Sequence, residues 1–250
     1  MSSTNANPPG PPGKRAGLLE SAMIKLFMRS GQVLDIEDVG PAFRIVTIGG
    51  EALRKVDWTP GDKLQISLGG WVQRTYTPLD WDAEAGRTRL LLSLDADGPG
   101  TQWARTLRKD DACILFGPRK SIDLTRRPSC AVLFGDETSF GLAAALLGAL
   151  RSTSTRLFFE VSSLAHAQSV LAPLGLEQAQ LSVRGVDDAH LAALEEGMLA
   201  ALQAQPTGNI VLSGKASSIQ RLSKRLKRSG IDSSRLQVKA YWAMGKTGLD

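Results

Sequence analysis

The stretch GGWVQRTYTPLDW, residues 69–81, places Arg74, Tyr76 and Thr77 within four consecutive positions. Its β-branched and aromatic residues favour a strand, and alternate side chains of a strand share a face, so Arg74 and Tyr76 point the same way. Arg74 offers a planar fork suited to a phosphate, and Tyr76 offers a flat surface suited to a ring. Pro78 fixes the backbone directly after Thr77, where the chain turns. A ligand with both a phosphate and a ring fits this set, although such a pair on a strand is more often simply solvated.

A second stretch, SLDADGPGTQWARTLRKDDACILFGP at residues 93–118, has a strand pattern, a glycine-rich turn and then a helical pattern. A turn of this kind at the start of a helix presents unpaired backbone N–H groups to an anion. Trp103 lies one turn into the predicted helix, where a core position is favoured over a cofactor contact. The residues of the turn are Gly98, Pro99, Gly100 and Thr101.

Together the two stretches resemble the flavin-binding half of the siderophore-interacting protein family, within the ferredoxin-NADP reductase superfamily. The resemblance runs from about Gly31 onward and rests on five motifs in the expected order. These are the Arg-x-Tyr-Thr strand, the Gly-Pro-Gly-Thr turn with Trp103 and Ala104, Gly117-Pro118-Arg119, the strand end Gly135-Asp136-Glu137-Thr138, and Tyr241-Trp242 followed by Gly245. The chain departs from the family pattern twice. Asp95-Ala96-Asp97 stands where a histidine is usual, and Lys215 stands where an acidic residue is usual.

The resemblance implies an N-terminal antiparallel β-barrel of Greek-key type that binds FAD, followed by a C-terminal α/β domain with a parallel sheet that binds NAD(P)H. Arg74 would bind the pyrophosphate of FAD and Tyr76 would lie against the isoalloxazine ring. Thr77, the catalytic candidate, would hydrogen-bond near the ring nitrogen that accepts hydride. Further implied cofactor-binding residues are Pro78, Gly98, Pro99, Gly100, Thr101, Thr138 and Trp242.

The implied nicotinamide site lies at the carboxyl ends of the parallel strands, where such sheets bind ligands. Asp136 and Glu137 either contact the ligand or cap the following helix. Ser213, Gly214 and Lys215 follow another strand, and the next helix adds further cations at Arg221, Lys224 and Arg225. This basic edge favours NADPH over NADH as the donor, whereas the plain alternative is a set of solvated helix charges.

The implied activity is hydride transfer from NAD(P)H to FAD, then single-electron delivery to iron(III) in a ferric siderophore, which releases iron(II). A flavin-binding carrier or regulatory module with a degenerate nicotinamide site is an alternative, and an α/β protein without flavin is a third.

Length and composition are those of a two-domain globular protein. The chain has 250 residues, of which 42% are hydrophobic and 22% charged, which is typical of a soluble protein. We predict a disordered tail over residues 1–15, an FAD-binding domain over 16–126 and a nicotinamide-binding domain over 127–250. No apolar run is long enough to cross a bilayer, and the start lacks a hydrophobic signal core. We therefore expect a cytoplasmic monomer without a membrane partner.

Cysteine, histidine and net charge narrow the chemistry further. Cys113 and Cys130 lie in apolar runs and are expected to be buried thiols. His166 and His190 lack neighbours at metal-ligand spacing, so redox chemistry is assigned to an organic cofactor. The net charge is +5 and the isoelectric point is near 9.4, which we attribute to anionic small ligands. Nucleic acid is not expected, because the interleaved aromatic residues of a single-strand binder are missing.

Hydrophobic periodicity changes near residue 127. Before it, strands are predicted over 32–39, 43–49, 63–69, 72–78, 87–94 and 112–117, with a helix near 101–108, which indicates a closed antiparallel barrel. An amphipathic stretch from Leu18 to Met28 either packs on the barrel or docks on a partner. After it, strands over 130–135, 155–161, 179–186, 208–214 and 235–242 alternate with helices over 139–150, 164–171, 188–203 and 217–227. This alternation predicts a parallel sheet with right-handed crossovers.

Overall fold

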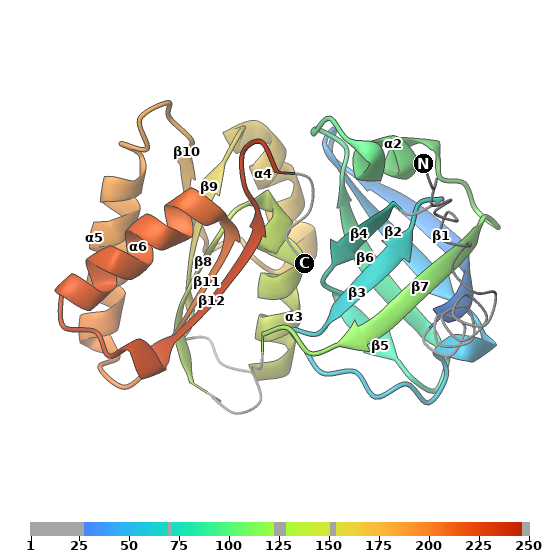
Figure 1. The fold of residues 1–250 in the computed structure, drawn as a ribbon, viewed down its shortest axis with the longest axis horizontal. Coiled ribbons are helices and arrows are strands. Elements are labelled where there is room, and N and C mark those ends of the chain that lie inside the picture. The colour runs from blue at the N-terminus through green and yellow to red at the C-terminus, as the bar shows by residue number, and fades with distance from the viewer. Residues whose placement is uncertain (1–27, 70–71, 123–128, 151–153, 247–250) are drawn as a thin grey trace, which may run out of the picture.

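The chain forms two domains that lie side by side (Figure 1), an antiparallel barrel followed by an α/β domain. The computed structural model describes residues 28–69, 72–122, 129–150 and 154–246. The predicted tail over residues 1–15 and most of the amphipathic stretch lie outside these ranges. The predicted domain boundary at 126–127 also falls outside them. Met28, the last residue of that stretch, begins the first strand instead of ending a helix.

The barrel is an antiparallel sheet of seven strands in the order β4-β3-β7-β1-β2-β6-β5. Its elements are β1 (Met28–Val39), β2 (Phe43–Gly49), the 3₁₀ helix η1 (Glu51–Leu53), β3 (Lys63–Ser67), β4 (Gln73–Tyr76), β5 (Asp80–Asp82), β6 (Arg87–Ser93), α2 (Pro99–Thr106) and β7 (Ala112–Arg119). The predicted strands are confirmed, and β5 is a short addition to them. In the described residues β4 and β5 are the two edge strands, and no ladder of hydrogen bonds joins them.

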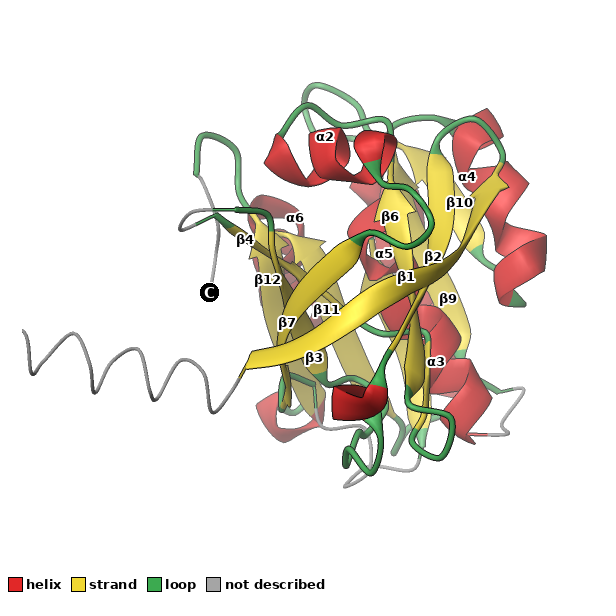
Figure 2. Ribbon diagram, turned by 90° about the vertical axis from the view of Figure 1, so that its right-hand side faces the viewer, coloured by secondary structure: helices red, strands yellow, loops and turns green. Residues whose placement is uncertain are grey.

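Alternation along the strands builds the barrel core. In β6, Thr88, Leu90 and Leu92 are fully buried while Arg87 and Arg89 face solvent. Leu90 and Leu92 pack with Ile48, Ile66 and other apolar residues of the barrel strands. Each fully buried aliphatic side chain contributes about 1.5–3 kcal/mol. Figure 2 shows α2 lying over one end of the strands. The close approach of Gly100 to Arg74 and Tyr76 places the first turn of α2 beside β4.

The second domain has a parallel sheet of five strands in the order β10-β9-β8-β11-β12. Its elements are β8 (Cys130–Gly135), η2 (Glu137–Ser139), α3 (Phe140–Leu150), β9 (Arg156–Val161), α4 (Leu164–Leu171), η3 (Ala172–Leu174), β10 (Gln180–Val183), α5 (Leu191–Ala204), β11 (Asn209–Lys215), α6 (Ala216–Arg228), η4 (Ser233–Arg235) and β12 (Leu236–Trp242). The predicted alternation is confirmed. β10 ends three residues early and α5 begins three residues late, because the connection between them contains Gly185 and a left-handed Asp188 with φ 56°.

The two domains share one hydrophobic core cluster. Phe43 of the barrel and Phe140 of α3 have ring centroids 5.8 Å apart, and Leu79 is buried in the same cluster. Nearby, His166 Nδ1 of α4 lies 2.8 Å from the carboxylate of Asp95, in the segment where the family usually has a histidine. The helices α3 and α4 therefore lie between the parallel sheet and the barrel (Figure 1), which sets the strand ends of the sheet opposite β4.

Both cysteines are buried and free, as predicted. Burial raises the pKa of Cys113 to about 11 and that of Cys130 to about 12, so neither is a thiolate near neutral pH. No helix among the described residues is long and apolar enough to span a membrane.

Candidate functional site

The two sequence stretches with ligand-binding features meet at one place, which we call the β4–α2 site: Arg74, Tyr76 and the first turn of α2. A Cβ atom built on Gly100 would lie 3.1 Å from the Tyr76 phenol oxygen and 3.2 Å from Arg74 Cγ. Arg74 and Tyr76 therefore share a strand face, as predicted, and the helix start lies directly against both. Only a glycine at position 100 leaves this approach unobstructed.

Polar and aromatic groups at the β4–α2 site are available for a ligand. Arg74 Nη1 donates to the carbonyl of its neighbour Gln73 at 2.7 Å, and no ion pair engages this guanidinium in the described part of the chain. Burial raises the pKa of Tyr76 to about 12 despite the opposing charge of Arg74, so the phenol is neutral. Trp103 packs partly buried against the barrel core, with its ring centroid 6.4 Å from that of Tyr76. Trp103 thus packs at the edge of the core and also supports Tyr76.

The first turn of α2 is open. Gly98 is the N-cap and has no side-chain cap hydrogen bond, Pro99 follows at the first helical position, and Thr101 is buried. A Cβ added to Gly98 would contact nothing within 4 Å. Because amides of a first helical turn lack intrahelical acceptors, this edge can receive an anion beside Arg74.

Thr77 faces the second domain. Its hydroxyl lies 3.5 Å from the hydroxyl of Tyr241, one residue before the end of β12, and Pro78 beside it is buried. Burial raises the pKa of Tyr241 to about 12, so this group is also a neutral phenol. Tyr241 was seen in the sequence only as part of the C-terminal Tyr-Trp motif, and its contact with the barrel was not predicted.

Asp136, directly after β8, lies against three other predicted site residues: Thr138, Gly214 and Trp242. Its carboxylate accepts the Thr138 amide at 2.9 Å and the Trp242 indole N–H at 2.7 Å, and it also contacts the Thr138 hydroxyl. A Cβ on Gly214 would lie 2.5 Å from the same carboxylate. Full burial raises the pKa of Asp136 to about 6. Of the two roles considered for Asp136, capping is confirmed, since its side chain caps η2.

Glu137 does not act as a cap but pairs with a cation that the sequence analysis did not single out. Arg184 Nη1 lies 2.8 Å from one Glu137 oxygen and Arg184 Nη2 donates to the other at 2.9 Å. The Ser162 hydroxyl donates to Glu137 at 2.7 Å. The Arg184 guanidinium also lies 5.9 Å from the centroid of Trp242, so Arg184 orients Glu137 and the indole together.

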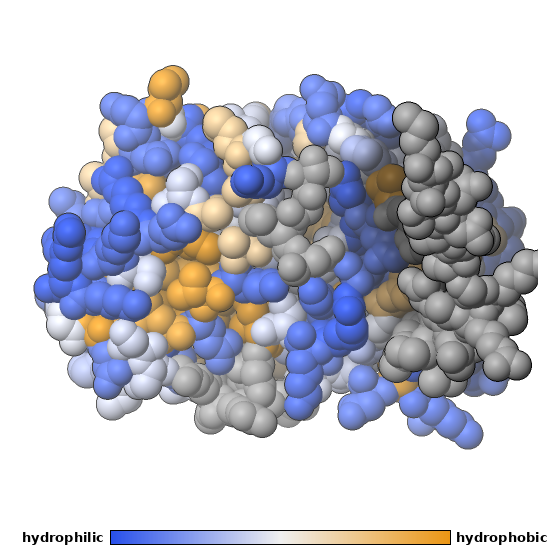
Figure 3. Space-filling model, in the orientation of Figure 1, coloured by the Kyte–Doolittle hydropathy of each residue, from blue (hydrophilic) through white to orange (hydrophobic). Residues whose placement is uncertain are grey.

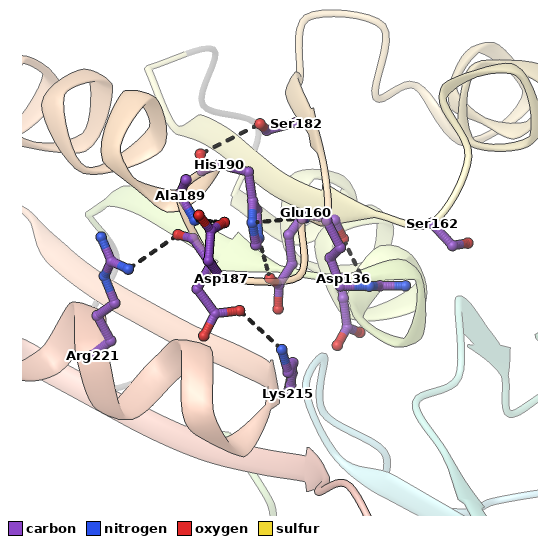
Figure 4. A network of polar contacts seen from close by, with 12 residues as sticks. Asp136, Glu160, Ser162, Ser182, Asp187, Ala189, His190, Lys215 and Arg221 are labelled. Atoms are coloured by element: carbon purple, nitrogen blue, oxygen red, sulfur yellow. Dashed lines mark hydrogen bonds and ion pairs between the residues drawn. The ribbon is translucent and has the colours of Figure 1, made fainter.

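A buried histidine–glutamate pair lies beside this group (Figure 4). His190 Nδ1 accepts the Gly185 amide at 3.1 Å, so the ring proton is on Nε2, which lies 2.7 Å from Glu160 Oε2. Glu160 is fully buried, and its other oxygen has no hydrogen-bond partner among the described residues. Spacing in the sequence could not reveal this pair, because 30 residues separate its members.

The remaining predicted nicotinamide residues are the last three of β11. Ser213 is buried and donates its hydroxyl to Ser139 at 2.8 Å, and Gly214 has a left-handed φ of 99°. Lys215 Nζ donates to Asp188 at 3.1 Å. The predicted residues of the second domain thus lie together at one end of its sheet. The Lys215 ammonium, however, is already paired with the Asp188 carboxylate.

Two family matches cover most of the chain. Residues 128–245 match the family described as siderophore-interacting protein, and residues 70–122 match the siderophore-interacting FAD-binding domain. Together they span more than two thirds of the 250 residues. No curated protein matches the chain.

Solved structures show a shared fold at low sequence identity. A siderophore utilization protein from T. fusca is 23% identical, with 89% of this chain and 95% of that chain covered and a TM-score of 0.68. The siderophore-interacting protein SipS from Aeromonas hydrophila is 18% identical, with 88% and 93% covered and a TM-score of 0.70. Phthalate dioxygenase reductase is 14% identical, with 89% and 70% covered and a TM-score of 0.70. The fold is that of ferredoxin reductase-like proteins.

Proposed function

The chain belongs to the siderophore-interacting protein family, and from that premise we propose that it passes electrons from NAD(P)H through FAD to a ferric siderophore and releases iron(II). The observation that carries the proposal is the close approach of Gly100 to Arg74 and Tyr76, which leaves little room for a Cβ at position 100. It makes a cation, an aromatic face and an open helix start parts of one site. That combination matches a ligand with a pyrophosphate and a planar ring system.

The residues of the β4–α2 site fit FAD. Arg74 would hold the pyrophosphate through a charge-assisted hydrogen bond. The backbone N–H groups of Gly98, Gly100 and Thr101 at the start of α2 would bind its other oxygens, whereas Pro99 has no N–H to donate. Tyr76 would lie against the ring system, and Thr77 would donate or accept a hydrogen bond at the ring edge. Bound there, FAD supplies the ability to accept two electrons as a hydride and to pass them on singly.

The strand-end residues of the second domain would position the nicotinamide. Thr138 and Trp242 are both held by Asp136, and Tyr241 brings β12 to within hydrogen-bonding range of Thr77. A dinucleotide at the carboxyl ends of the strands would therefore have its reactive ring between the two domains. The cations at Lys215 and Arg221 favour NADPH as the donor.

A ferric siderophore suits this electron path. Hard oxygen chelators hold iron(III) more tightly than iron(II), so one-electron reduction is a means of release. One NADPH carries two electrons, which two ferric ions take singly, and one proton is set free. The net charge of +5 attracts anionic ferric complexes.

Anaerobic spectroscopy tests the proposal. The FAD-loaded protein is mixed with NADPH, flavin bleaching is followed, and a ferric siderophore is then added with a coloured iron(II) chelator. We expect bleaching, then iron(II) formation with return of the flavin absorbance. Bleaching without iron(II) would assign another acceptor. A yellow protein that NADPH does not bleach would favour the carrier or regulatory alternative instead.

A further inference from the structure

Two cations of the second domain converge on a single residue. Lys215 Nζ donates to the Asp188 carboxylate at 3.1 Å, and Arg221 Nη1 donates to the Asp188 backbone carbonyl at 3.0 Å. Lys215 ends β11 and Arg221 lies in the second turn of α6, so both extend from the carboxyl end of the sheet. Figure 4 shows one dashed contact from Lys215 and one from Arg221, both to the segment that carries Asp187 and Ala189. One residue thus supplies both the negative charge and the acceptor for this pair of cations.

Asp188 reaches this position from the far side of the sheet. The segment 184–190 leaves β10, an edge strand, and extends to the end of β11, which lies three strands further along. Both ends of the segment are fixed. Arg184 is held by Glu137, and His190 is held by Glu160. Asp188 lies between these fixed points, and its backbone carbonyl also accepts the Leu191 amide at 3.1 Å. Among the described residues its carboxylate contacts only Lys215, so the carboxylate can swing away without disrupting either end.

The cations would stay in place if the Asp188 carboxylate moved away. Arg221 Nε donates to Glu195 at 3.0 Å, which holds the guanidinium independently of Asp188. Lys215 has only 13% of its side chain exposed, so it is confined near the strand end. A groove of about 390 Å³ continues from Arg221 and is lined by Glu195, Ser217, Gln220, Lys224, Arg225 and Arg228. Hydrophilic side chains cover the outer part of α6 (Figure 3).

We propose that Lys215 and Arg221 form a phosphate site for the nicotinamide dinucleotide, and that Asp188 occupies it as an internal anion that the incoming phosphate displaces. The inference rests on the proposed function and adds the regulation of its nucleotide site. A phosphate offers the same two features as Asp188, a negative charge and acceptor oxygens, to an ammonium and a planar guanidinium. The nucleotide's apparent affinity is reduced by the fraction of protein in which Asp188 fills the site.

Calorimetric titration with NADP⁺ and with NAD⁺ tests the proposal without turnover. In Asp188→Asn the charge is removed, while the left-handed backbone, which asparagine tolerates, is preserved. We expect affinity to rise about fivefold, the size of a partly exposed ion pair. Asp187→Asn is the matched control, because it removes an equal charge one residue away. Among the described residues the Asp187 side chain accepts only the Ala189 amide, at 3.1 Å. Lys215→Gln should weaken binding.

The two nucleotides distinguish the source of the phosphate. A gain for NADP⁺ alone assigns the site to the 2′-phosphate, and a gain for both assigns it to the shared pyrophosphate; either result supports the site. Equal affinities for Asp188→Asn and Asp187→Asn, or no loss in Lys215→Gln, would overturn it. If NADPH still bleaches the flavin in that case, the proposed function stands and this inference alone fails. If the wild-type protein binds neither nucleotide and is not bleached, both fail.

Discussion

The backbone of Gly100 lies so close to Tyr76 that a Cβ at position 100 would sit 3.1 Å from the phenol oxygen. Tyr76 cannot easily move aside, because it packs against the barrel core and against Trp103. The helix start and the strand are thus set at a fixed separation by the absence of one side chain. This relationship makes the β4–α2 site open to direct tests.

We expect Gly100→Ala to reduce FAD affinity without loss of stability. The new methyl group must displace Tyr76 or the stem of Arg74 by a few tenths of an ångström, whereas alanine favours the helix by up to about 1 kcal/mol. Gly98→Ala is the control, since its Cβ would contact nothing and φ at 162° is extended backbone open to any residue. Flavin content and thermal unfolding of the apoprotein measure the two effects. Equal flavin content in both variants would contradict the close-approach argument.

Arg74→Ala should lose FAD. A charge-assisted hydrogen bond to phosphate contributes about 1.5–3 kcal/mol, so FAD binding should weaken roughly tenfold or more. Arg74→Lys should recover only part of the affinity, because an ammonium cannot make a paired, planar contact. Flavin fluorescence titration measures both dissociation constants. Full flavin retention in the alanine variant would make Arg74 a surface residue.

Asp136 predicts a pH-dependent component of stability. Its pKa rises from 3.8 to about 6 on folding, so the folded state binds its proton more tightly than the unfolded state. Protonated Asp136 therefore contributes about 3 kcal/mol to the free energy of unfolding below about pH 4. This contribution is lost as the pH rises through about 6. Carboxylates with lowered pKa values, such as Asp38 and Asp82, act in the opposite direction, so wild type alone is not informative.

The difference between wild type and Asp136→Asn isolates this component. Urea unfolding at several pH values should give a wild-type advantage that declines between about pH 4 and 7. The asparagine amide cannot accept the Trp242 N–H if its oxygen remains with Thr138, which adds an offset independent of pH. The informative quantity is therefore how the difference in unfolding free energy between the two proteins changes with pH. A difference that stays constant with pH would show that Asp136 does not titrate in this range.

The strands and helices were predictable because their hydrophobic periods are strong. Cys130–Gly135 is a continuous apolar run that is buried throughout, and the residues of β6 alternate between core and solvent. The exceptions have local causes. The three residues of β5 are too few to show a period. β10 ends at Val183, although the sequence remains compatible with a strand up to Val186.

The candidate site was predictable only where its members are neighbours in sequence. Arg74, Tyr76 and Thr77 share one strand, whereas Arg184 meets Glu137 across 47 residues and His190 meets Glu160 across 30. Such pairs depend on the order of strands in the sheet, which periodicity does not encode. The contact of Asp188 with Lys215 was missed for the same reason, so the sequence offered Lys215 only as part of a phosphate-binding edge or as a solvated charge.

Nicotinamide preference should depend on Lys215. In Lys215→Glu the cation becomes an anion beside Asp188, and like charges at this distance repel a phosphate as well as each other. We expect the wild-type protein to be reduced more efficiently by NADPH than by NADH, and the variant to lose that preference. Rates of flavin reduction under anaerobic conditions decide it. Equal rates with NADPH and NADH in wild type, or the same NADPH-to-NADH rate ratio in the variant as in wild type, would contradict a role of Lys215 in donor preference.

Reduction of an anionic ferric siderophore should slow as salt is raised. If the flavin is the electron carrier, the acceptor must come close to its exposed edge, and the net charge of +5 concentrates an anionic complex around the protein at low ionic strength. Attraction between exposed charges is largely screened beyond about 10 Å at 0.1 M salt. The apparent affinity for an anionic ferric siderophore should therefore weaken with salt, whereas that for a neutral one should not. Iron(II) is trapped with a coloured chelator across a salt series for both substrates. Matching salt profiles would discard electrostatic attraction while leaving the reductase activity in place, because a neutral complex has no charge for salt to screen.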